Sequence, residues 1–189
     1  MHARRYWYVE TLGEAIEGYS VDEQTGFESV FHRHYEPVAR AVARVVRDTA
    51  RAEEIAAEAF WKLWRNPNVS ASGYRAAWLY KTAIRMALDE LKKEARRLRR
   101  ESEQSERLPA QTPEEAHAVS EERNRVRLIL AALDPRQAEL LLLRHSDLSY
   151  AEVAAALDLN PASVGTLISR AQQAFRKEYV SQYGEPDYE

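Results

Sequence analysis

The sequence predicts an all-α fold of two small helical domains joined by a flexible acidic linker, the second with a helix-turn-helix. Apolar residues recur at helical spacing along most of the chain. The charge reverses in the middle, since residues 74–100 hold nine Lys or Arg against three acidic residues, and residues 101–122 hold seven Glu against one Arg. Residues 157–179, LDLNPASVGTLISRAQQAFRKEY, predict a tight turn followed by a capped helix.

Composition excludes several classes of protein. The 189 residues, 45% apolar and 30% charged, suffice for one large or two small helical domains. The absence of cysteine excludes a disulfide scaffold and a thiolate metal site. The apolar runs are too short for a membrane span, and the amino-terminal residues lack the apolar core of a signal peptide. These features predict a cytoplasmic protein without membrane insertion. A net charge of −3 argues against coating nucleic acid by charge alone.

The first half, residues 27–100, is predicted to be helical. Pro37 is expected to end or kink its first helix. In ARAEEIAAEAFWKLWR, apolar residues from Ala52 to Trp64 form a core-facing stripe, and Ala57 and Trp61 are expected on the opposite, charged face. A large aromatic among charges suggests a protein partner. The alternative is that Trp61 covers a neighbouring loop.

A polar loop, RNPNVSASGYR, precedes a long basic helix, AAWLYKTAIRMALDELKKEARRLRR. Tyr80, Ile84, Leu88 and Leu91 should face the core, whereas the basic residues fall near one side. Aromatic residues with cations beside a loop are typical of surfaces that hold unpaired bases. The alternative is a solvated basic face with the aromatics in the core.

The second half is predicted to contain a helix-turn-helix. Ser149 can cap a helix from Tyr150 to Leu157, Asp158 can occupy the turn, and Asn160 with Pro161 can start the next helix. Its outward edge carries small polar groups and cations that fit a major groove. A plain helix pair is the alternative. The outward edge of the helix that starts at Pro161 consists of Ser163, Thr166, Ser169, Arg170, Gln173 and Lys177.

These segments, in this order, resemble the sigma-70 family in its small extracytoplasmic-function (ECF) form, which keeps only regions two and four. AEEIAAEAFWKLWR resembles the helix that docks on the clamp coiled coil of RNA polymerase, and AAWLYKTAIRMALDELKKEARR resembles the promoter-melting helix. ALDPRQAELLLLRHSDLSYAEVAAALDLNPASVGTLISRA resembles region four, which reads the minus-35 element. The resemblance implies core RNA polymerase, promoter DNA and an anti-sigma factor as partners, with promoter affinity supplied mainly by polymerase.

The resemblance also implies three sets of site residues. For core polymerase they are Glu53, Glu54, Glu58, Trp61 and Lys62. For the minus-10 element they are Asn66, Asn68, Tyr74, Trp78, Lys81, Arg85, Lys92 and Arg96. For the minus-35 element they are the six residues of the outward edge. The implied domains are an N-terminal extension (1–26), region two (27–100), a linker (101–111), region four (112–180) and a tail (181–189).

Several positions depart from the family pattern. Glu54 and Ala57 stand where Asp and Gln are common, so one polar polymerase contact is missing. Gly165 and Leu167 replace common basic residues, which leaves fewer phosphate contacts. Met86 follows Arg85 where Asn is usual, which predicts an unusual base preference.

Catalysis finds little support in the sequence. The clustered Glu residues lie on a polar helix face, and His32 and His34 point to different sides of a helix, so neither an enzyme nor a metal or cofactor site is expected. Two alternatives to a sigma factor stay open. One is a stand-alone helix-turn-helix regulator, and the other is a sigma-like protein that binds partners without initiating transcription.

Overall fold

The computed structural model describes residues 21–66, 74–104 and 114–185. Within these ranges every regular element is a helix, which confirms the predicted all-α class. The helices are α2 Val21–Ala43, α3 Thr49–Trp64, α5 Arg75–Gln104, α6 Glu114–Ala132, α7 Pro135–Arg144, α8 Tyr150–Leu157 and α9 Pro161–Tyr183.

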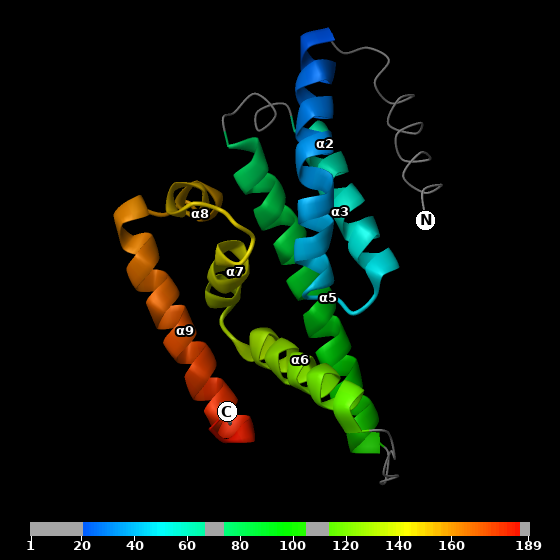
Figure 1. Ribbon diagram of the computed structural model, residues 1–189, viewed down its shortest axis with the longest axis vertical. Coiled ribbons are helices and arrows are strands. Elements are labelled where there is room, and N and C mark those ends of the chain that lie inside the picture. Colours follow the sequence, from blue (N-terminus) through cyan, green and yellow to red (C-terminus); the bar gives the residue numbers. More distant parts are fainter. Residues whose placement is uncertain (1–20, 67–73, 105–113, 186–189) are drawn as a thin grey trace.

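An aromatic cluster lies at the contact between α2 and α3. The rings of Phe27 and Trp64 lie 4.8 Å apart, and those of Phe31 and Phe60 lie 5.0 Å apart, both edge to face. Phe60 is fully buried. Such contacts add to the stabilisation from apolar burial, so this cluster fixes α3 against α2. Figure 1 shows α2 and α3 side by side, with the longer α5 alongside them.

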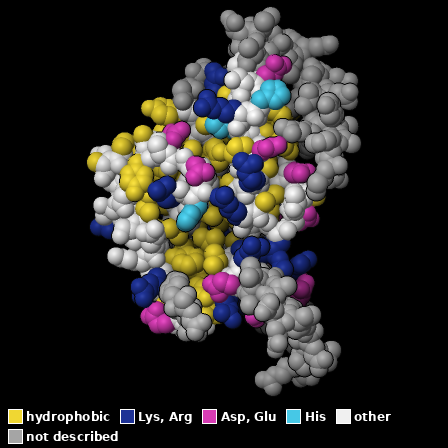
Figure 2. Space-filling model, viewed as in Figure 1, with side chains coloured by type: hydrophobic (Ala, Val, Ile, Leu, Met, Phe, Trp, Pro, Cys, Tyr) yellow, Lys and Arg dark blue, Asp and Glu magenta, His cyan; other side chains and the backbone are white. Residues whose placement is uncertain are grey.

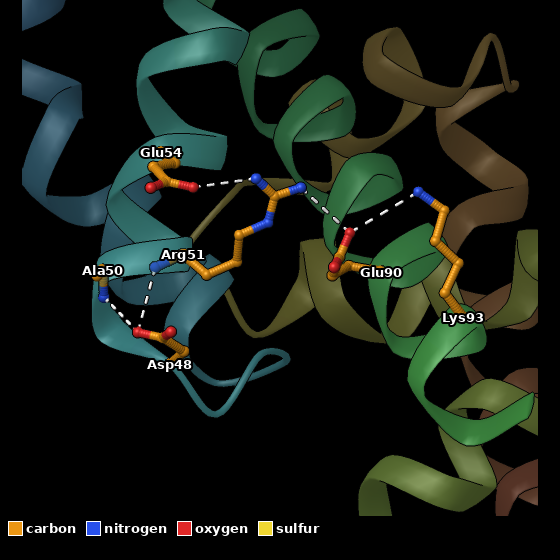
Figure 3. A network of polar contacts seen from close by, with 6 residues as sticks. All are labelled: Asp48, Ala50, Arg51, Glu54, Glu90 and Lys93. Atoms are coloured by element: carbon orange, nitrogen blue, oxygen red, sulfur yellow. Dashed lines mark hydrogen bonds and ion pairs between the residues drawn. The ribbon is translucent and has the colours of Figure 1, made fainter. Parts of the chain in front are cut away.

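Polar contacts fix the start of α3 and join it to α5 (Figure 3). The Asp48 carboxylate accepts hydrogen bonds from the backbone N–H groups of Ala50 and Arg51, at 2.8 and 3.3 Å. The Arg51 guanidinium reaches Glu54 at 3.1 Å and Glu90 of α5 at 3.2 Å. The N-cap therefore sets where α3 begins, and Arg51 links it to the long helix.

The second half forms the predicted helix-turn-helix. Ser149 and Glu152 form a reciprocal capping box at the start of α8, and Asp158 ends it in the left-handed conformation at φ 54°. Asn160 Oδ1 accepts from the Ala162 N–H at 3.0 Å, and Pro161 is the first residue of α9. These short-range signals give α8 the bounds that the sequence predicts.

The two halves pack on one another through α5. On one side α5 contacts α2 and α3, and on the other it contacts α6, α7 and α8. Buried apolar residues of both halves form one continuous core. In Figure 1, α9 lies on the far side of α7 from α5. The minus-10 candidates on α5 and the minus-35 candidates on α9 thus belong to one packed assembly.

Some predicted boundaries differ from the structure. Pro37 lies inside α2 and does not end it, because burial of Phe31, Val38 and Val42 on both sides stabilises the continuous helix. Helix α2 begins at Val21, before residue 27, and α9 runs on to Tyr183. Helix α5 extends to Gln104, so residues 101–104 of the expected linker are helical. Residues 105–111 lie outside the described ranges, and the domain boundaries stay a prediction.

We expect Phe60→Ala to lower the free energy of unfolding by about 3–5 kcal/mol, because it removes a fully buried ring from the aromatic cluster. The adjacent substitution Trp61→Ala provides a matched control on the same helix, since Trp61 is 40% exposed. It should cost about 1 kcal/mol or less. Urea unfolding followed by circular dichroism compares the two, and equal losses would contradict the assignment of Phe60 to the core.

Candidate nucleic-acid interfaces

Helix α9 presents the expected polar edge. Val164, Ile168 and Ala171 are buried against the rest of the second half. On the opposite side, five of the six candidates are exposed: Thr166, Ser169, Arg170, Gln173 and Lys177. Ser163 is half-buried, and its Oγ donates to the Asn160 carbonyl oxygen at 2.7 Å. The edge available to an external partner therefore centres on residues 166–177.

The orientation of α9 is set by α7 and α8. Arg136 of α7 donates a hydrogen bond to the Leu157 carbonyl oxygen at the end of α8. The Tyr150 ring lies against Gly165, where a Cβ would come within 3.4 Å of it, and the Arg144 guanidinium lies 5.7 Å from the ring centroid. Gly165 thus lies at the contact of α8 with α9, and Leu167 is partly buried against the core.

The outer face of α3 carries the polymerase candidates. Glu54, Glu58, Trp61 and Lys62 are exposed, and Glu53 is half-buried. Glu58 and Lys62 pair at 3.2 Å, one turn apart. Ala57 was expected on this face, but it is only 5% exposed, because α3 is covered by both α2 and α5. The exposed face is therefore narrower than predicted, with Trp61 as its large apolar group.

The minus-10 candidates lie along α5 and at the end of α3, and the structure divides them by exposure. Tyr74, Arg85 and Arg96 are exposed, whereas Asn66, Trp78, Lys81 and Lys92 are half-buried. Asn68 lies outside the described residues. The buried Tyr80 belongs to the core, as its spacing predicts. The basic side of α5 is therefore partly buried, and α6, α7 and α8 of the second half all contact this helix.

The clearest case of this covering is Arg85. Its Nε lies 2.5 Å from Oε1 of Glu139 on α7, and its Nη2 lies 3.3 Å from Oε2. The Glu139 side chain is 6% exposed, whereas that of Arg85 is 50% exposed. Burial lowers the pKa of the nearby Lys81, and the Arg85 charge lowers it further. Two cations expected to touch DNA thus lie against α7.

Sequence reasoning missed the buried charged residues at this contact. Arg127 is 7% exposed; its Nε donates to the Val45 carbonyl oxygen at 2.6 Å, and its Nη2 lies 2.6 Å from Glu94. Glu139 stands inside the apolar run AELLLL, and Arg127 inside VRLIL. A charge at a core-facing helical position requires a buried partner, and that was the available signal.

His34 of α2 lies beside the same contact. Its ring meets Tyr80 of α5 edge to face, with centroids 6.1 Å apart. Burial lowers the pKa of His34, the neighbouring Arg33 lowers it further, and the Glu152 carboxylate of α8 opposes both. The neutral imidazole is therefore the form that this site favours.

The face shown in Figure 2 is mixed in character. Basic and acidic side chains alternate over it, and apolar side chains reach the surface between them in its lower half. No helix in the described part of the chain is both long and apolar enough to cross a membrane.

Comparison with known proteins assigns both halves. Residues 30–97 match the family described as sigma-70 region 2, and residues 123–174 match sigma-70, region 4. The ECF RNA polymerase sigma factor SigK of Mycobacterium tuberculosis is 32% identical over 164 residues, which span 82% of this chain and 84% of the relative. SigK of Mycobacterium ulcerans is 31% identical, spanning 71% and 74%. SigE of Mycolicibacterium smegmatis is 24% identical, spanning 92% and 70%.

The free energy of unfolding should fall as the pH drops below 6.5, the ordinary pKa of His34. Folding lowers this pKa, so the unfolded chain binds the proton more readily and acid favours unfolding. In the His34→Gln variant, the free energy of unfolding should decline less steeply between about pH 8 and about pH 5.5, because the titrating imidazole is absent. Urea titrations across this range measure it, and identical slopes in parent and variant would rule out the contribution of His34.

Proposed function

The chain belongs to the ECF branch of the sigma-70 family and is an RNA polymerase sigma factor, and from this premise we propose how its surfaces share promoter recognition. Members of this family are initiation factors, which bind core RNA polymerase and promoter DNA. The observation that carries the proposal is the exposed polar edge of a capped helix-turn-helix in the same chain as a region-two domain. We place the protein in the cytoplasm, where promoter DNA is.

The outer face of α3 is the proposed docking surface for core polymerase. Trp61 supplies an exposed apolar anchor, and Glu54, Glu58 and Lys62 supply charges around it. Interfaces commonly place an aromatic anchor inside a polar rim, and this face has that composition. The burial of Ala57 leaves Trp61 as the main source of apolar contact there.

The start and basic side of α5 are the proposed minus-10 surface. Tyr74 is 60% exposed, and an aromatic ring with this exposure can stack on an unpaired base. Arg85 and Arg96 offer guanidinium groups to the strand next to it. Asn66, Asn68, Trp78, Lys81 and Lys92 complete the proposed set.

The edge of α9 from residue 166 to residue 177 is the proposed minus-35 surface. Thr166, Ser169 and Gln173 can meet base edges, and Arg170 can contact either a guanine or a phosphate. The edge carries few cations, so its affinity for duplex DNA alone should be modest. This modest affinity favours a protein that reads DNA while polymerase holds the DNA. It argues against a stand-alone regulator. We also propose an anti-sigma factor as a regulatory partner.

A run-off transcription assay with core polymerase and genomic fragments from the organism encoding the chain tests the function. We expect transcripts from defined start sites that require the chain. Specific duplex binding by the chain alone, without initiation, would favour the stand-alone regulator. Polymerase binding without initiation would favour a sigma-like interaction protein.

Trp61→Ala should weaken binding to core polymerase by about tenfold or more, as expected for loss of an aromatic anchor. Fluorescence anisotropy of the labelled chain, titrated with core polymerase, measures the affinity. Arg176→Ala removes an exposed side chain from α9, outside the proposed docking surface, and serves as the control. Equal affinities of Trp61→Ala and the parent, with the fold intact by circular dichroism, would refute the docking surface.

Arg170→Ala should reduce initiation from an identified promoter by about tenfold, within the range of about 1–3 kcal/mol for a base contact. Arg176→Ala is the matched control, because Arg176 is an exposed arginine of the same helix that pairs with Glu185. Replacing the minus-35 sequence of the template should abolish the difference between Arg170→Ala and the parent. Equal loss in both arginine variants would show a general charge effect instead of site reading.

A further inference from the structure

A network of charged side chains connects the proposed polymerase surface on α3 to the long helix α5 (Figure 3). Arg51 of α3 is at its centre, and it pairs with Glu54 on one side and with Glu90 of α5 on the other. We propose that Arg51 is a positioning residue for polymerase docking: Glu90 anchors its guanidinium, and the guanidinium holds the Glu54 carboxylate in the orientation that core polymerase binds. This inference rests on the proposed docking surface, and it adds two residues that act through Glu54.

The guanidinium of Arg51 is fixed from two directions. The Arg51 backbone N–H donates to Oδ1 of the N-cap residue Asp48 at 3.3 Å, and Nη2 donates to Oε2 of Glu90 at 3.2 Å. Glu90 is itself paired with Lys93 on α5, at 3.8 Å. An arginine side chain loses rotamer freedom when its head group is held as well as its backbone. The remaining terminal nitrogen, Nη1, is thereby directed toward Glu54.

The contact with Arg51 orients Glu54 and still leaves it able to bind a partner. Nη1 of Arg51 donates to Oε2 of Glu54 at 3.1 Å, and the Glu54 side chain is 52% exposed. A carboxylate has about four lone-pair sites on its two oxygens, so it can accept further hydrogen bonds. The Oε1 atom of Glu54 can therefore accept a hydrogen bond from core polymerase while Oε2 stays paired with Arg51.

The exposure of this network favours a role in docking over a role in folding. The side chains of Arg51, Glu54 and Glu90 are 40%, 52% and 35% exposed. Ion pairs in contact with solvent generally add little to stability. In contrast, a long side chain that is ordered before association lowers the entropy cost of binding. The network should therefore change the affinity for polymerase more than it changes the stability of the chain.

The first test is made on the free chain, without polymerase. Rotation about the Nε–Cζ bond of Arg51 exchanges Nη1 and Nη2, so it requires both ion pairs to break. In ¹⁵N NMR spectra this rotation should be slower in the parent than in Glu90→Gln, and Arg51→Gln identifies the signal by its loss. Equal rotation rates in the parent and in Glu90→Gln would overturn the proposal.

The second test is a double-mutant cycle on the affinity for core polymerase, measured by fluorescence anisotropy. Arg51→Gln should weaken binding by about two- to tenfold, as expected when one long side chain is no longer ordered in advance. Glu54→Gln should weaken binding at least as much. The variant with both substitutions should bind as well as Glu54→Gln alone, because Arg51 acts through Glu54. Arg176→Gln is the matched control, since it breaks an exposed arginine–glutamate pair on α9 and should leave the affinity unchanged.

Losses that add in the double variant would overturn the positioning role, because Arg51 would then act independently of Glu54. An unchanged affinity of Arg51→Gln, with Glu54→Gln and Trp61→Ala both weakened, would refute the role of Arg51 and leave the proposed docking surface standing. Parent-like affinities of Glu54→Gln and Trp61→Ala would refute the docking surface and the positioning role together. The midpoint of urea unfolding should stay at the parent value in each charge variant, and affinity losses that follow a lowered midpoint would also overturn the proposal.

Discussion

Burial of the apolar side of α5 is the interaction on which the rest of the structure depends. Leu79 and Ile84 of this helix are almost fully buried, and the core to which they belong includes residues of α2, α3, α7 and α8. Because one helix serves as the packing surface for both halves, the charged groups at the edges of that surface are brought together. Arg85 meets Glu139, and Arg127 meets Glu94, as a consequence of this shared packing.

This sharing gives α5 two competing uses. Its polar side carries cations that we propose meet promoter DNA, and one of them, Arg85, pairs with the buried Glu139 of the second half. A chain with a net charge of −3 can therefore carry a basic helix, because part of the charge of that helix is paired within the chain.

The sequence predicts the local features of this molecule well, because they depend on neighbouring residues. Ser149 with Glu152, and Asn160 with Pro161, start α8 and α9 where expected, and the spacing of Val164, Ile168 and Ala171 predicts the buried side of α9. The exposure of Trp61 follows from the same helical periodicity. The burial of Ala57 does not follow from periodicity, because it depends on which helices cover α3. The contact of the two halves joins residues such as Arg85 and Glu139, 54 positions apart, and helical spacing carries no signal for their pairing. A buried charge within AELLLL indicates only that a partner is needed.

The most direct test of the account is to remove a buried side chain from the apolar side of α5. Ile84 is 1% exposed and belongs to the core that both halves share. Ile84→Ala should lower the free energy of unfolding by about 2–5 kcal/mol. Because α5 packs against both halves, backbone amide hydrogen exchange should become faster in α3 and in α7 alike. Faster exchange confined to α2 and α3, with α7 unchanged, would contradict the account.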